Sequence, residues 1–197
     1  LYFSKLSRHL ENDSKFSAEL IAELRNYQTV WEPSGRSTIK GLQTVKNINL
    51  LEQQSAHIVE LRSIILAEVE SYFSQFKDEA CVFINEWPME KSLLGWHVIL
   101  KQQGHQSPHI HPTGWLSGVI YLQVVPCLDK NEGAIEFSLN GMYHFDDRAP
   151  TVVHQPAQGD IILFPSSLYP RTIPFTADTD RITISFDLKP KTRPATG

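Results

Sequence analysis

Two histidines that lie two positions apart, His109 and His111, have the clearest capacity for chemistry in this sequence. In an extended segment, side chains at positions i and i+2 point to the same side, so both imidazoles can bind one metal ion. The pair lies in the stretch Gly104-His105-Gln106-Ser107-Pro108-His109-Ile110-His111-Pro112, directly before an apolar run from Trp115 to Leu122. Imidazole is a common ligand of zinc, copper and non-haem iron. We therefore predict that His109 and His111 are metal ligands.

The elements that must position this pair are short strands, because the hydrophobic pattern from residue 80 onward has a period of two. The clearest example is 181–188, where Ile182, Ile184, Phe186 and Leu188 alternate with Arg181, Thr183, Ser185 and Asp187. Similar strands are expected at 96–101, 116–125, 135–139, 151–154 and 160–164. Many short strands separated by Pro and Gly, without helices between them, predict a mainly β fold, an antiparallel sandwich or jelly roll.

The first part of the chain favours helices. Ser14 is expected to cap one helix, and a longer one is predicted from Ser55 to Phe76, where apolar residues recur every three or four positions. Residues 31–52 are mostly polar and are expected to form a loop. We predict a single domain, 1–197, in which a helical part (about 14–78) braces a jelly-roll core (about 80–190).

Composition narrows the function further. Charged residues make up 20% of the 197 residues, and the net charge is −4 without a basic block, so nucleic acid is not an expected partner. No apolar run is long enough to cross a membrane, and no secretory signal peptide is recognisable. We expect a cytoplasmic protein whose two cysteines, Cys81 and Cys127, are buried free thiols. The sequence begins with Leu1 rather than Met, which is compatible with a piece of a longer protein.

Four longer motifs resemble the bacterial 2-oxoglutarate/Fe(II)-dependent oxygenases that are often associated with tetratricopeptide repeats. The resemblance covers roughly residues 30–190. It implies a double-stranded β-helix with the metal at its mouth and Fe(II) and 2-oxoglutarate as cofactors. The motifs are Gly95-Trp96-His97-Val98, the stretch 109–122 (HIHPTGWLSGVIYL), the stretch 159–167 (GDIILFPSS), and Arg171-Thr172-Ile173-Pro174-Phe175 followed by 181–186 (RITISF).

Carried over residue by residue, His109 resembles the first metal ligand of these enzymes. His111 occupies the position where most of the superfamily has a carboxylate. Arg181 resembles the arginine that binds the far carboxylate of 2-oxoglutarate, and Thr183 the small hydroxyl residue two positions later. The strand period supports this independently, because it places Arg181 and Thr183 on the face opposite Ile182 and Ile184.

The chain departs from the family pattern at Pro170. The distal metal-binding histidine is expected here, and proline has no side-chain donor atom. Three alternatives stay open: His105 folds back as the third ligand, His154 reaches across from a neighbouring strand, or 2-oxoglutarate itself completes a weak site.

The resemblance implies a dioxygenase that hydroxylates an unidentified small-molecule or peptide substrate, and it leaves the oligomeric state open. The alternative is a catalytically inactive jelly-roll binding module, either a pseudo-oxygenase or a cupin-like sensor. The residues after His111, Pro-Thr-Gly-Trp-Leu-Ser, contain no acid, which disfavours a cupin-type ligand set.

Overall fold

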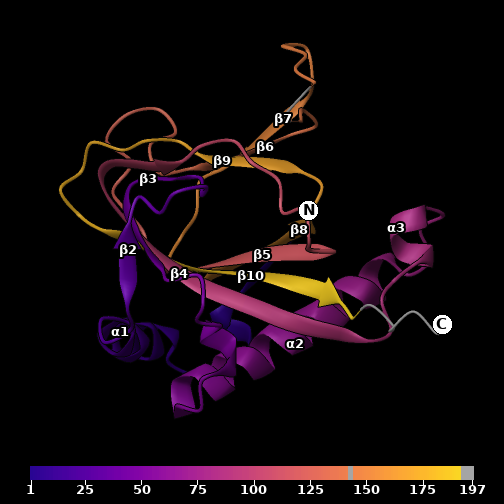
Figure 1. Ribbon diagram of the computed structural model, residues 1–197, viewed down its shortest axis with the longest axis horizontal. Coiled ribbons are helices and arrows are strands. Elements are labelled where there is room, and N and C mark those ends of the chain that lie inside the picture. The colour runs from indigo at the N-terminus through magenta and orange to yellow at the C-terminus, as the bar shows by residue number, and fades with distance from the viewer. Residues whose placement is uncertain (142–143, 192–197) are drawn as a thin grey trace.

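The computed structural model describes residues 1–141 and 144–191. Within this part, two antiparallel sheets face each other, one of seven strands in the order β1-β8-β5-β10-β4-β3-β2 and one of three in the order β7-β6-β9. Figure 1 shows the smaller sheet above the larger one and helices α1 and α2 below it. The strands are β1 Tyr2–Lys5, β2 Thr29–Trp31, β3 Thr38–Thr44, β4 Lys91–Gln106, β5 Leu116–Gln123, β6 Ile135–Ser138, β7 Thr151–His154, β8 Asp160–Pro165, β9 Tyr169–Thr172 and β10 Arg181–Pro190. The helices are α1 Asp13–Leu24, α2 Ala56–Phe76 and α3 Val82–Asn85, with single 3-10 turns η1 Leu6–Arg8 and η2 Leu50–Glu52.

The predicted mainly β jelly roll with bracing helices is confirmed. Helices α1 and α2 bury one apolar stripe each against the outer face of the large sheet, where Leu20, Leu61 and Ile65 are fully enclosed. Strand β10 contributes Ile182, Ile184, Phe186 and Leu188 to this same core. None of the helices in the described residues is long and apolar enough to cross a membrane.

Strand β10 also supplies the inner face of the large sheet. Because side chains alternate along a strand, Arg181, Thr183, Ser185 and Asp187 point the other way, toward the smaller sheet. A second apolar cluster fills the space between the two sheets: Val119, Tyr121, Ile135, Phe137, Ile162 and Phe164. The polar row of β10 therefore lies beside an apolar wall, which is the setting of the candidate site.

Several sequence-based expectations for the first part of the chain were wrong in detail. Helix α1 is capped by Asn12, whose side chain accepts the Lys15 N–H at 2.9 Å, and not by Ser14. Residues 31–52 are not a loop, because β3 pairs with β4 and β2 pairs with β3. The buried side chains of β3 are largely polar and bond to one another, as Thr38 does to Gln43, so the segment lacks an apolar alternation.

Two further expectations need correction. Cys81 and Cys127 are exposed rather than buried, because Cys81 lies at the start of α3 and Cys127 in the loop between β5 and β6. Strand β9 was not expected, since Pro170 lies within it. The proline is tolerated because β9 forms the edge of the small sheet and needs ladder bonds on one side only.

Candidate active site

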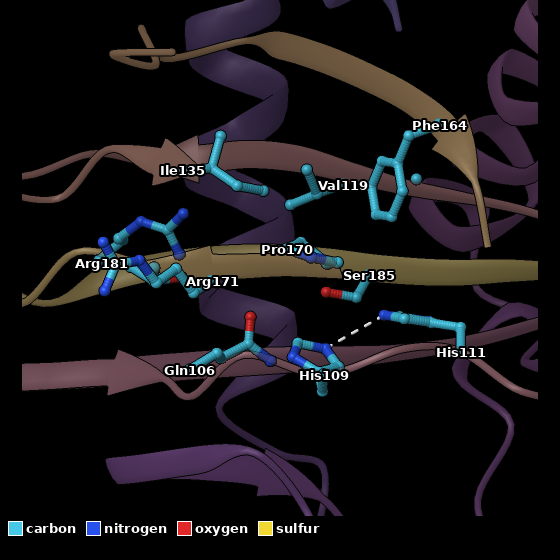
Figure 2. Close-up of a pocket in the computed structure, with 12 residues that line it drawn as sticks. Gln106, His109, His111, Val119, Ile135, Phe164, Pro170, Arg171, Arg181 and Ser185 are labelled. Atoms are coloured by element: carbon cyan, nitrogen blue, oxygen red, sulfur yellow. Dashed lines mark hydrogen bonds between the residues drawn. The ribbon is translucent and has the colours of Figure 1, made fainter. Parts of the chain in front are cut away.

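One pocket between the two sheets is lined by most of the residues for which a chemical role was predicted. Its lining includes His109, His111, Pro170 and Arg181, together with Gln106, Ser185 and the apolar side chains Val119, Ile135 and Phe164. Figure 2 shows the two imidazoles at one end of the pocket and Arg181 at the other, with the apolar wall along the side. Segments as far apart in sequence as β4 and β10 thus place their polar residues around one space.

The backbone fixes the His-x-His segment on both sides of its two rings. The His109 N–H donates to the Pro170 carbonyl at 3.2 Å, and the His111 N–H donates to the Ser166 carbonyl at 3.1 Å. The segment therefore lies along the end of β8 and the start of β9, and both rings point into the pocket. Their Nε2 atoms are 3.1 Å apart.

The proton positions on the two rings follow from their other partners. Nδ1 of His109 is 2.8 Å from the Ser107 carbonyl, which can only accept, so Nδ1 carries the proton. Nδ1 of His111 is 2.7 Å from a carboxylate oxygen of Asp187 and donates to it in the same way. Burial, reinforced by charge on His111, lowers the pKa of His109 to about 4, so its Nε2 is a bare lone pair.

Because both Nδ1 atoms carry a proton, the lone pairs of the two Nε2 atoms face each other at 3.1 Å. A cation between them removes this repulsion, either a shared proton or a metal ion bound by both. Two ligands at about 2.1 Å from one metal and at right angles to each other are about 3 Å apart. The pair thus fits two neighbouring positions around a single metal ion. The role of His109 and His111 as metal ligands stays a prediction.

The opposite end of the pocket is built to receive an anion. Arg181 is only 2% exposed, has no carboxylate partner among the described residues, and its Nε lacks any hydrogen-bond partner. Burial lowers its pKa. The guanidinium lies 4.9 Å from the ring centroid of Tyr121, whose hydroxyl also lacks a partner and whose pKa is raised to about 12 by burial. An unpaired buried cation is costly, so this end of the pocket fits a carboxylate ligand.

Thr183 and Tyr121 lie directly across from each other on β10 and β5. The Thr183 hydroxyl is buried and has no partner, although Thr183 does not line the pocket itself. Tyr121 was not identified from the sequence, because its apolar strand gave no sign that a hydroxyl would meet Arg181. Arg181, Tyr121 and Thr183 each leave a buried polar atom without a partner, and Arg181 is the one of the three that lines the pocket.

The protein supplies an incomplete set of metal donors. Pro170 is buried and lines the pocket, as expected for the position of a distal histidine, but it offers no donor atom. Within residues 1–141 and 144–191, no third His, Cys, Asp or Glu joins the pair in an arrangement that could hold a metal ion. His105 faces the Gln103 carbonyl at 3.3 Å, and His154 bonds Asp160 at 3.2 Å. The residues present therefore offer two imidazoles to a metal ion and one buried guanidinium to a carboxylate.

Residues 95–187 match the family described as "Putative 2OG-Fe(II) oxygenase". No curated protein matches the chain.

Among solved structures, a prolyl-4-hydroxylase from Pseudomonas putida matches with a TM-score of 0.62 at 12% identity, over 96% of this chain and 93% of that chain. HygX from Streptomyces hygroscopicus, solved with nickel and 2-oxoglutarate, matches with a TM-score of 0.60 at 12% identity, over 90% and 79%. A prolyl hydroxylase from Trichoplax adhaerens, solved with a peptide fragment of hypoxia inducible factor, matches with a TM-score of 0.61 at 14% identity, over 90% and 78%.

At such low identities these structures establish the shared fold, the double-stranded β-helix. The family match is independent of them and spans every residue that lines the pocket. Through residues 95–187, this chain is similar to the 2OG-Fe(II) oxygenases.

Proposed function

We propose that this chain is an Fe(II)- and 2-oxoglutarate-dependent dioxygenase that hydroxylates a small-molecule or peptide substrate. His109 and His111 would hold the metal ion, and 2-oxoglutarate would complete its coordination. The observation that carries the proposal is the buried Arg181, whose guanidinium has no carboxylate partner in a pocket that also holds two converging imidazoles. When bound, the cofactor pair supplies oxidative attack on a substrate C–H bond.

The residues of the chain have separable tasks in this proposal. Arg181 would bind the far carboxylate of 2-oxoglutarate through charge-assisted hydrogen bonds, with the hydroxyls of Tyr121 and Thr183 nearby. From Arg181 to Ser185 the inner face of β10 extends about 13 Å, at about 3.3 Å per residue. The pocket between them is therefore long enough for a five-carbon dicarboxylate to reach toward the histidines.

The apolar wall of Val119, Ile135 and Phe164 would keep water from the reacting atoms. A low local dielectric also strengthens the attraction between Arg181 and a carboxylate. Because Pro170 removes one protein donor, metal binding should depend on 2-oxoglutarate more strongly than in a site with three protein ligands. The two cofactors are expected to assemble together.

Anaerobic addition of Fe(II) and 2-oxoglutarate tests the proposal directly. We expect the visible charge-transfer band of a chelated iron–2-oxoglutarate complex, and succinate after oxygen is admitted. The variant Arg181→Met should lose the band, whereas Arg148→Met should keep it, because Arg148 is exposed, pairs with Asp146 at 3.0 Å and does not line the pocket. The absence of both band and succinate in the wild type would refute an oxygenase and favour a binding module.

A further inference from the structure

A buried carboxylate lies directly behind one of the two imidazoles. One oxygen of Asp187 accepts hydrogen bonds from Nδ1 of His111 and from the hydroxyl of Ser117, both at 2.7 Å. The Ser117 hydroxyl is in turn 2.7 Å from the hydroxyl of Ser166. All three side chains of this Asp187–Ser117–Ser166 network are almost fully enclosed, with 5%, 0% and 3% exposure.

The turn after His111 fits closely over the network. A Cβ atom on Gly114 would lie 2.5 Å from the Ser166 hydroxyl and 3.2 Å from Cγ of Asp187, so only glycine leaves room. The Gly114 N–H donates to the His111 carbonyl at 3.0 Å, and the His111 N–H donates to the Ser166 carbonyl. Both the backbone and the ring of His111 are thus fastened to the same group of residues.

The network also contains the carboxylate next to this end of the pocket. The pocket lining contains no carboxylate, and the one ion pair that Asp187 forms among the described residues is with His111. His109, by contrast, is oriented by the neutral carbonyl of Ser107. Any cation held by the two imidazoles therefore has its nearest negative charge one ring away, at Asp187.

We propose that Asp187 is a positioning residue that acts through His111. It holds His111 in the tautomer with Nδ1 protonated, which leaves Nε2 free to bind a cation. It also supplies through the ring the negative charge that most of the superfamily places directly on the metal at the position of His111. The assignment rests on the proposed function, since it takes the cation to be the metal.

The tautomer can be measured in the metal-free protein by ¹⁵N-histidine NMR, from the separate resonances of Nδ1 and Nε2. The wild type should show His111 protonated on Nδ1. In Asp187→Leu the acceptor is gone, and the proton should move to Nε2, where it can donate to Nε2 of His109. An unchanged tautomer in this variant would overturn the proposal.

The charge is tested separately with Asp187→Asn, which keeps the shape and an acceptor oxygen. Binding of Co²⁺ in the presence of 2-oxoglutarate should weaken about 10- to 100-fold, the usual effect of losing an outer partner of a metal-bound histidine. Asp180→Asn is the matched control, because Asp180 lies just before β10 and pairs with Lys101 instead. Wild-type affinity in Asp187→Asn would overturn the charge role.

Metal binding and the orientation of the His111 ring are decided by different measurements. A wild-type protein that binds no Co²⁺ with or without 2-oxoglutarate refutes the proposed function and with it the charge role of Asp187. The positioning of the ring is then decided by the tautomer alone: a shift in Asp187→Leu supports it and no shift overturns it. Thermal unfolding of each variant separates these results from a loss of fold.

Discussion

Replacing Pro170 by histidine should tighten metal binding, because the new imidazole would enter the pocket next to His109 and His111. Pro170 is buried, lines the pocket, and its carbonyl already holds the His109 N–H at 3.2 Å. Four-ligand structural metal sites bind with about 10–16 kcal/mol, or about 2.5–4 kcal/mol per donor. Fixing an imidazole side chain costs about 1 kcal/mol. The net gain is about 1.5–3 kcal/mol, a roughly 10- to 150-fold lower Kd for the metal.

Titration with Co²⁺ in the absence of 2-oxoglutarate, followed by its visible absorption, measures this gain. Tyr169→His is the matched control, since Tyr169 is the preceding residue of β9 and does not line the pocket. We expect tighter binding in Pro170→His and wild-type binding in Tyr169→His. An unchanged Kd in Pro170→His, or an equal gain in both variants, would show that position 170 does not face the metal.

Three further predictions concern buried polar groups. Arg181→Met should weaken 2-oxoglutarate binding about 100-fold in calorimetry. The free energy of unfolding of the ligand-free protein should stay unchanged or rise, because an unpaired buried cation is removed. A large loss of stability would contradict this. Burial lowers the pKa of His97 to about 4, so the unfolded chain takes up a proton first and stability falls by about 3 kcal/mol as pH drops from 6.5 toward 4. His97→Gln should flatten urea-unfolding stability against pH across this window, and an identical slope would refute it. Glu68 accepts hydrogen bonds from Tyr2 and Ser4 inside the core, so Glu68→Leu should lower the free energy of unfolding by about 3 kcal/mol, and a wild-type Tm would disprove this role.

The strands and helices that were predicted correctly are those in which burial imposes a simple period. In β10, Ile182 and Ile184 face the helices while Arg181 faces the pocket, as the alternation indicated. Helix α2 begins after Ser55, whose hydroxyl accepts the Ile58 N–H, as its cap and apolar stripe suggested. Such patterns depend only on neighbouring residues, so they can be recognised in a single sequence.

The features that escaped prediction depend on pairing between distant segments. Strand β3 buries Thr38 and Gln43 because they bond to each other, which no hydrophobic period reports. Asp187 stands in the predicted alternation, but its contact with His111 depends on a segment that precedes it by 76 positions. Tyr121 meets Arg181 only through the register of β5 on β10. Positions of single donors could be predicted, whereas their partners required the folded chain.

The Kd for Co²⁺, with and without saturating 2-oxoglutarate, in the wild type and in Arg181→Met, decides whether the metal and 2-oxoglutarate share one site. If His109, His111 and Arg181 bind one metal–2-oxoglutarate complex, each ligand should tighten the other by the same factor, about 100-fold, near the upper end of usual coupling energies. This coupling should disappear in Arg181→Met. Independent binding of Co²⁺ and 2-oxoglutarate in the wild type would contradict a shared site.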